Sequence, residues 1–332
     1  MKKTRLFLIV GLLFLCIPSS QASAEGGKKF QIELFGGFTT LNPHDLNKRA
    51  EFDQMYESFF TEDQYQYYHT LFGDNYTYTG RIDGEFKKIK DAFPMGLQLR
   101  YFLTPGISVS LGFKTLSRTQ DSQVSHQYDV RSVNPDGVLF FDEFSNSIKN
   151  RPYSLFVEAY VPMVGIHYKM AEMSPITFES YIAAGPLLAH CLVQRERYAI
   201  TTDSYEYWEK INQIYKIEGQ GTGIAVDAGI QMNIKLIRSF ELFIEGGYSF
   251  QRAGNITGKG RSETNRRDQN SSGYTQKSEW EGQWANVQGS YNREWGNMNF
   301  TFPSNEYGID NFSRFYLDLS GFQIKIGISL KL

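Results

Sequence analysis

The segment from Phe322 to Leu332 reads FQIKIGISLKL, and its alternation decides the fold. Every second residue is apolar, and the apolar positions are Phe322, Ile324, Ile326, Ile328, Leu330 and Leu332. Because successive residues of a β-strand point to opposite faces, the segment predicts a strand with one apolar face and one polar face. A transmembrane β-barrel needs such a last strand, which closes against the first strand and faces lipid with one side. We therefore expect an all-β, antiparallel up-and-down transmembrane barrel.

The same alternation recurs along the chain. The expected strands lie at about residues 30–42, 93–103, 107–114, 153–169, 178–198, 224–236, 240–248 and 315–332. Their number is about eight, and ten is the alternative if residues 129–144 or the fifth loop region adds a hairpin. In the fourth strand the apolar positions change from odd, at Tyr153, to even, at Val164. Because a proline cannot donate to the strand ladder, Pro162 predicts a β-bulge there.

The connections between these strands alternate in length. Those after the second, fourth and sixth strands are a few residues long, whereas the others are much longer. Outer-membrane barrels have short periplasmic turns at one end and long extracellular loops at the other. In the first long loop, Asp45 and Asn47 could start a short helix from about Lys48 to Phe60, which we expect outside the membrane.

The polar faces of the expected strands carry glycine and charged residues. The predicted lumen charge network consists of Glu33, Arg100, Lys114, Glu158, Glu179, Asp227, Lys235, Glu241, Glu245 and Lys325. Because side chains fill the interior of an eight-strand barrel, this pattern favours structural ion pairs. The alternative is that the charges line a narrow pore.

Aromatic residues on the apolar faces fall at two heights. The group near the short turns is Phe30, Tyr101, Tyr168, Phe178 and Phe240, and the group near the long loops is Phe38, Phe93, Phe113, Tyr153, Tyr248 and Phe322. Aromatic girdles at both membrane interfaces have this arrangement. The pattern therefore favours an apolar face that points to lipid.

The N-terminus has the features of a secretory signal peptide. Lys2, Lys3 and Arg5 precede an apolar run at 6–17, and Ala22-Ser23-Ala24 provides a cleavage site. We expect a signal peptide at 1–24 and one barrel domain at 25–332. Only Cys191 would survive processing, so no internal disulfide is expected. The net charge of -2 and the spread of Lys and Arg along the chain exclude a nucleic-acid-binding surface.

The opening strand FQIELFGGF at 30–38 and the closing stretch LSGFQIKIG at 319–327 resemble the small OmpA/OmpX-like outer-membrane barrels. The resemblance covers the barrel alone, without the peptidoglycan-binding domain that OmpA carries after it. It implies a location in the outer membrane of a Gram-negative-type bacterium, with outer-membrane lipid as partner. It also implies recognition of the last strand by the barrel-insertion machinery, with Leu332 where the family usually has an aromatic residue. We expect a monomer.

All four tryptophans, Trp208, Trp280, Trp284 and Trp295, fall in expected outer loops. Tryptophan often anchors binding surfaces, so these residues are candidates for binding an extracellular ligand. The alternative is that the loops pack on themselves, or that the rings rest at the lipid headgroups.

Nothing in the sequence predicts catalysis, a metal site or a cofactor. Barrel enzymes include lipid-A deacylases, which use a His-x-Ser pair, and omptin proteases, which use Asp and His at the outer rim. None of the five histidines is followed by x-Ser, and His190 and Cys191 point to opposite faces of one strand. We expect a non-enzymatic surface or envelope protein. The alternatives are a narrow passive pore and, less favoured, a lipid-modifying enzyme.

Overall fold

The computed structural model describes residues 29–51, 53–54, 76–133, 143–203, 208–237, 239–270, 273–288 and 311–332. In these ranges the chain is almost entirely antiparallel β-structure, with one helix at 44–51 that continues through 53–54. That helix is too short and too polar to cross a membrane, and the described residues include no other candidate. The predicted signal peptide at 1–24 and Trp295 lie outside the described residues.

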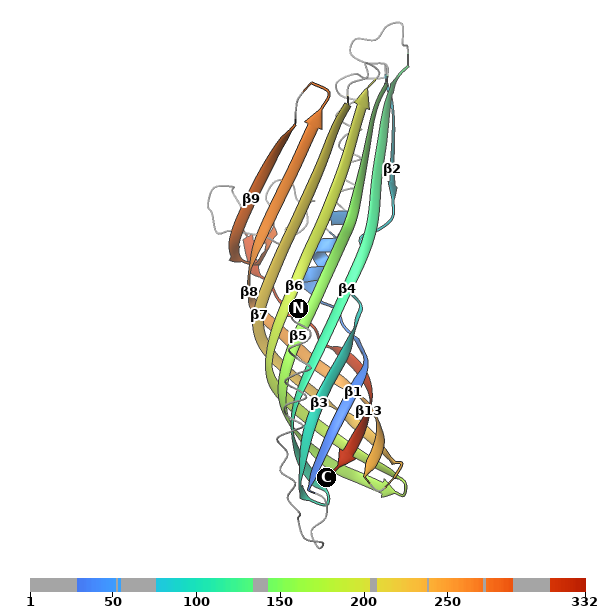
Figure 1. Cartoon of the computed structure of the whole chain (residues 1–332), viewed down its shortest axis with the longest axis vertical. Helices are drawn as coiled ribbons and strands as arrows, with labels where there is room; N and C mark the ends of the chain where they lie inside the picture. Colours follow the sequence, from blue (N-terminus) through green and yellow to red (C-terminus); the bar gives the residue numbers. More distant parts are fainter. Residues whose placement is uncertain are drawn as a thin grey trace.

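Eight strands form a closed ring (Figure 1). They are β1 (Phe30–Thr40), β3 (Asp91–Thr104), β4 (Ile107–Ser132), β5 (Glu143–Met173), β6 (Ile176–Asp203), β7 (Trp208–Lys235), β8 (Phe240–Asp268) and β13 (Gly321–Lys331). Each pairs antiparallel with the next, and β13 closes the ring between β8 and β1, where Gln31 pairs with Lys331. The predicted antiparallel ring of eight strands, closed by the last strand, is confirmed.

Further strands extend the ring into a sheet of eleven. β2 (Tyr76–Asp83) pairs with β4, while β9 (Tyr274–Gln283) and β12 (Leu317–Asp318) pair with β8. A separate two-stranded sheet consists of β10 (Ala285–Gln288) and β11 (Asn311–Arg314). The ring itself has eight strands, which is the first of the two numbers that the sequence predicts.

The strands differ greatly in length. β1 and β13 have 11 residues each, whereas β5 has 31. At about 3.3 Å per residue, β5 is far longer than a membrane-spanning strand requires. β4 to β8 therefore continue beyond the closed ring as an open sheet, with β2 and β9 at its edges (Figure 1). Much of the sequence predicted as long loops forms this sheet.

The outer face of the ring is apolar all the way round. On β13, Phe322 is 71% exposed and Ile326 is 55% exposed. Other strands contribute further exposed apolar side chains, including Phe38, Met95, Leu111, Val164, Ile182, Ile224 and Ile244. We call this band of outward side chains the apolar belt.

The interior of the ring changes character along its axis. Toward the short turns it is filled with buried polar and charged side chains. Toward the open sheet it becomes a hydrophobic core, which includes Leu116, Tyr153, Leu187, Val193 and Phe315. The ring therefore holds two layers of different polarity.

This change of polarity corrects the prediction for β5. Alternation continues through Pro162, which pairs with Phe113, and the β5–β6 register is the same at Tyr160 and at Val164. Tyr153 points inward and is fully buried, as are Leu155 and Val157. The predicted bulge and the predicted outward position of Tyr153 are both wrong, because the apolar residues of upper β5 face a core and not lipid.

The helix at 44–51 lies against the inner surface of the sheet. Its residues Leu46 and Ala50 are fully buried. Asp53, one of the helical residues at 53–54, forms ion pairs with Arg49 (Nε–Oδ2 3.0 Å) and with Arg195 of β6 (Nη1–Oδ1 3.3 Å). The helix begins at residue 44, earlier than the predicted start near Lys48, and its buried residues complete the upper core. Its predicted place outside the membrane stays a prediction.

Candidate functional site

The first candidate site is the charge network inside the ring. Arg100 of β3 is 1% exposed and lies between two carboxylates from other strands. Its Nη1 is 2.8 Å from Oε1 of Glu33, and its Nη2 is 2.6 Å from Oε2 of Glu179. Arg100 also donates to Ser108 Oγ at 2.9 Å, and Gln231 of β7 donates to Glu33 at 3.2 Å. This cluster ties β1, β3, β6 and β7 together across the interior.

A second cluster lies nearer to the hydrophobic core. Lys114 of β4 is 2.5 Å from Asp227 of β7, and Lys325 of β13 is 2.6 Å from Glu245 of β8. Lys325 also lies 3.5 Å from Asp227, and the Tyr181 hydroxyl donates to Glu245 at 2.5 Å. Two cations thus face two carboxylates in a buried, internally balanced group.

The ten residues predicted for the lumen network separate into three groups. Glu33, Arg100, Lys114, Glu179, Asp227, Glu245 and Lys325 are buried in the two clusters, and Glu241 is buried beside Lys331, with which it forms an ion pair. Glu158 is half-buried on the outward row of β5, and Lys235 is exposed at the end of β7. The interior position predicted for these two residues is wrong, because Glu158 lies on the strand segment whose inward row is apolar and Lys235 lies beyond the filled interior.

His167 joins the interior network. Its Nε2 lies 2.9 Å from Gln98 Nε2 and 3.1 Å from Ser110 Oγ, and its ring stacks on Tyr181. His190 is outward on β6, with its ring 5.7 Å from that of Phe156, whereas Cys191 points inward and is fully buried. As predicted from strand geometry, His190 and Cys191 occupy opposite faces.

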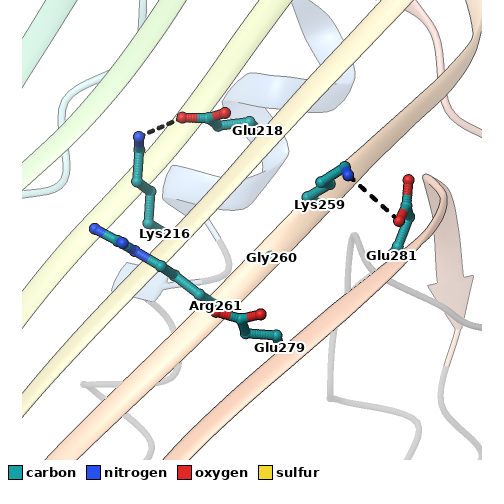
Figure 2. A pocket seen from close by; sticks show the side chains of 7 residues that line it. All are labelled: Lys216, Glu218, Lys259, Gly260, Arg261, Glu279 and Glu281. Carbon is teal, nitrogen blue, oxygen red and sulfur yellow. Dashed lines mark ion pairs between the residues drawn. The ribbon is translucent and has the colours of Figure 1, made fainter.

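The second candidate site is a concavity on the outer face of the open sheet, formed by β7, β8 and β9 (Figure 2). Its volume is about 500 Å³, and it is lined by Lys216, Glu218, Lys259, Gly260, Arg261, Glu279 and Glu281. We call it the charged concavity. The side chains stand on three neighbouring strands above the apolar belt.

Cross-strand pairing orders the charges of this concavity. Glu218 pairs in register with Lys259, and Lys259 with Glu281. Lys216 forms an ion pair with Glu218, and Lys259 Nζ lies 3.5 Å from Glu281 Oε2. The hydrogen bond from Lys216 holds the pKa of Glu218 below its ordinary value. Charges alternate along the row Glu218–Lys259–Glu281, whereas in the neighbouring row Lys216 lies beside Arg261, which pairs with Glu279.

Sequence reasoning missed the charged concavity. Its residues lie in segments that the sequence predicts as loops. Charged residues nevertheless recur there with a spacing of two, as in Lys216-x-Glu218, Lys259-x-Arg261 and Glu279-x-Glu281. That spacing places both residues of each pair on one face of a strand. It was the signal that could have identified the site.

Trp208 and Trp284, the two tryptophans whose side chains the structure describes, lie in different surroundings. Trp208 is half-buried at the start of β7, with Lys210 Nζ 5.0 Å from its ring. Trp284 is buried and packs edge-on against Phe315 with ring centroids 5.1 Å apart, so its predicted place in a binding loop is wrong. Trp280 belongs to β9, but its side chain, like Trp295, lies outside what the structure describes.

The proteins that match this chain come from the solved structures. No protein-family model matches the chain, and no curated protein matches it in sequence. Among solved structures, the chain matches the outer membrane protease OmpT from Escherichia coli, with 6% identity and a TM-score of 0.29 over 95% of this chain and 100% of that chain. The predicted resemblance to the OmpA/OmpX-like barrels therefore has no support from a family model.

This match contradicts the prediction that the chain is not an enzyme, since the similar structure is a protease, and the prediction is withdrawn. At this TM-score and identity the match assigns no catalytic role to any residue here. The site must be judged from its own geometry.

Proposed function

We propose that this protein is an integral outer-membrane β-barrel that holds an extended, charged β-sheet outside the membrane. The observation that carries the proposal is the apolar belt, which surrounds a closed ring whose interior is buried and charged. The ring spans the lipid, and the open sheet of β2 and β4 to β9 is the part that meets solutes or partners.

The distribution of polarity supports the membrane-spanning part. Soluble proteins rarely expose a contiguous apolar patch larger than about a few hundred Å². Here strongly exposed apolar side chains occur on every strand of the ring. In lipid those side chains need no cover, while the closed ring leaves no unpaired strand edge in the hydrocarbon.

The lengths of the connections support an orientation. The turns at 105–106 and 174–175, and the described residues 236–237 and 239 between β7 and β8, lie at one end of the ring, and the open sheet extends from the other end (Figure 1). In outer-membrane barrels short turns face the periplasm and long segments face outward. The charged concavity would then lie outside the cell, above the outer leaflet.

The narrow-pore alternative fits the structure less well. Arg100, Lys114 and Phe243 are among the largest fully buried side chains, and all three project into the ring. Above them the helix at 44–51 and the hydrophobic core occupy the interior. An eight-strand barrel has room for side chains but not for side chains and a wide water path.

Refolding with and without lipid tests the proposal. The mature chain should fold in detergent micelles or phosphatidylcholine vesicles, with strand-rich circular dichroism and a gel mobility that changes on boiling. It should precipitate in plain buffer. A folded, soluble protein in detergent-free buffer would contradict the proposal, because the apolar belt would then have to be covered by protein.

A further inference from the structure

The segment between β2 and β3 has exposed lysines at the rim of the ring. Residues 85–90 read EFKKIK, and we call them the basic strap. Phe86 and Ile89 are buried in the core, whereas Lys87, Lys88 and Lys90 are exposed. The two apolar anchors therefore fix which side of the strap faces solvent.

Interior side chains hold the backbone of the basic strap in place. The Phe86 amide donates to Gln54 Oε1 at 3.0 Å, and the Lys87 amide donates to Ser122 Oγ at 2.8 Å. Asn47 accepts from the Ile89 amide and donates to the Ile89 carbonyl, both at 2.8 Å. Because the backbone is fixed before any ligand arrives, the lysines lose little backbone freedom on binding.

The basic strap lies directly above the apolar belt. It leads into β3, whose residue Phe93 is 53% exposed and packs edge-on against Phe38 with centroids 6.2 Å apart. Lys90 precedes Phe93 by three residues, which is about 10 Å of extended chain. Aromatic side chains mark the membrane–water interface, and lysines just beyond them lie where lipid phosphates are found.

The charges around the strap leave lysines available. Lys88 forms an ion pair with Glu51, and Arg118 forms one with Asp91 at 3.1 Å. Glu85 stands at the strap's other end, away from Phe93. Within the described ranges, neither Lys87 nor Lys90 forms an ion pair with a carboxylate. Two exposed ammonium groups therefore face the rim without a fixed partner there.

We propose that the basic strap binds the phosphate of lipid headgroups in the adjoining leaflet, through Lys87 and Lys90. The inference rests on the proposed membrane-spanning function and adds a lipid class to it. The phosphate of the lipid headgroup is negatively charged and lies at the height of the strap. The acyl chains of the same lipid lie along the apolar belt beneath Phe93 and Phe38.

Lipid retention in nanodiscs tests this proposal. The protein is placed in phosphatidylcholine nanodiscs containing a minor fraction of phosphatidic acid, and the lipids it retains are counted by native mass spectrometry. Wild type should enrich phosphatidic acid. A juxtamembrane lysine contributes about fivefold, so Lys87→Gln with Lys90→Gln should reduce the enrichment by roughly 25-fold. Lys87→Arg with Lys90→Arg should retain it.

A matched control separates the strap from general surface charge. Lys210→Gln with Lys277→Gln removes two exposed lysines from β7 and β9, far above the belt and outside the charged concavity, and should leave the enrichment unchanged. Equal loss in the control pair would overturn the proposal, as would a wild type that shows no enrichment. Displacement of the lipid by millimolar inorganic phosphate would also overturn it, since the site would then take the free ion.

Different results would contradict the membrane-spanning barrel and the lipid site at the basic strap. A protein that does not enter even pure phosphatidylcholine nanodiscs contradicts the membrane-spanning barrel. A protein that enters them with unchanged strand content, but retains both lipids equally, contradicts the basic strap alone.

Discussion

Asn47 forms two hydrogen bonds with the backbone of Ile89, one in each direction and both 2.8 Å long, although 41 residues separate them in the chain. This pair fastens the inner helix to the basic strap, and both residues are buried. An amide side chain satisfies both backbone groups in a place where water cannot.

Asn47→Ala should therefore destabilise the protein. The substitution leaves the Ile89 amide and carbonyl buried without partners, which costs about 1–3 kcal/mol for each group that stays unsatisfied. Urea unfolding in micelles measures the loss, and amide exchange should rise first at 85–90. Gln220→Ala, on an exposed outward position of β7, is the control and should change stability little. Unchanged exchange at the strap would contradict this role of Asn47.

Arg100→Met should be more damaging, since it leaves Glu33 and Glu179 as buried, unpaired charges. Breaking a buried ion pair costs about 3–5 kcal/mol. Adding Glu33→Gln and Glu179→Gln to the same protein should recover much of that loss, because the uncompensated charges are gone. Arg81→Gln, which breaks an exposed pair with Asp83, is the matched control and should cost little. Similar losses in Arg100→Met and Arg81→Gln would contradict the buried network.

Ile326→Lys tests the apolar belt. Ile326 is exposed on β13, between Gly36 and Ile244 of the neighbouring strands. A lysine at mid-bilayer on the lipid face costs about 2–4 kcal/mol, but near the interface about 0–1 kcal/mol. Thr222→Lys, on the outward row of β7 beyond Ile224, should therefore cost much less in vesicles. Equal, small effects at both positions would indicate that the belt faces water.

Planar-bilayer recordings test the filled interior. Because Arg100, Lys114 and the core side chains occupy the ring, the reconstituted protein should give no discrete openings. Discrete openings that disappear on Arg100→Gln would support the pore instead. Glu158→Gln is the control, since Glu158 points outward and its neutralisation should leave any lumen current unchanged.

The carboxyl group of Glu218 should titrate below its ordinary pKa of 4.5. The hydrogen bond from Lys216 stabilises the charged form, so this contribution to stability is present above the ordinary pKa and is lost as the pH falls through the lower, folded value. Carbon-13 NMR titration of the carboxylate measures it. In Lys216→Gln the pKa of Glu218 should rise, and an unchanged value would contradict the pairing.

The ring could be predicted from the sequence because one face of each ring strand is uniformly apolar. In β13 the outward row from Phe322 to Ile328 is unbroken, and its polar row supplies Lys325 to the interior. Two constraints, an apolar outer face and a charged interior, act on the same strand. Together they determine which segments form strands and which side chains point outward.

The upper part could not be predicted by the same rule. Toward the open sheet the inner face becomes apolar and the outer face polar. The apolar residues Tyr153 and Leu155 therefore point inward, although the alternation of β5 is not interrupted. Alternation reports which residues share a face, but not which face is buried. In the open sheet, charged residues such as Lys259 and Glu281 occupy the outer row in place of apolar residues. The sequence pattern therefore predicts loops where the structure has strands.

Pairing between β1 and β13 has a consequence for how the chain folds. These strands lie at opposite ends of the described sequence, and Gln31 meets Lys331. Contacts this distant in sequence form slowly, because the loop entropy is lost before they contribute stability. Until β13 arrives, β1 and β8 each present a bare edge of amides and carbonyls. Deletion of the last eleven residues should therefore leave an aggregation-prone open sheet rather than a smaller cylinder.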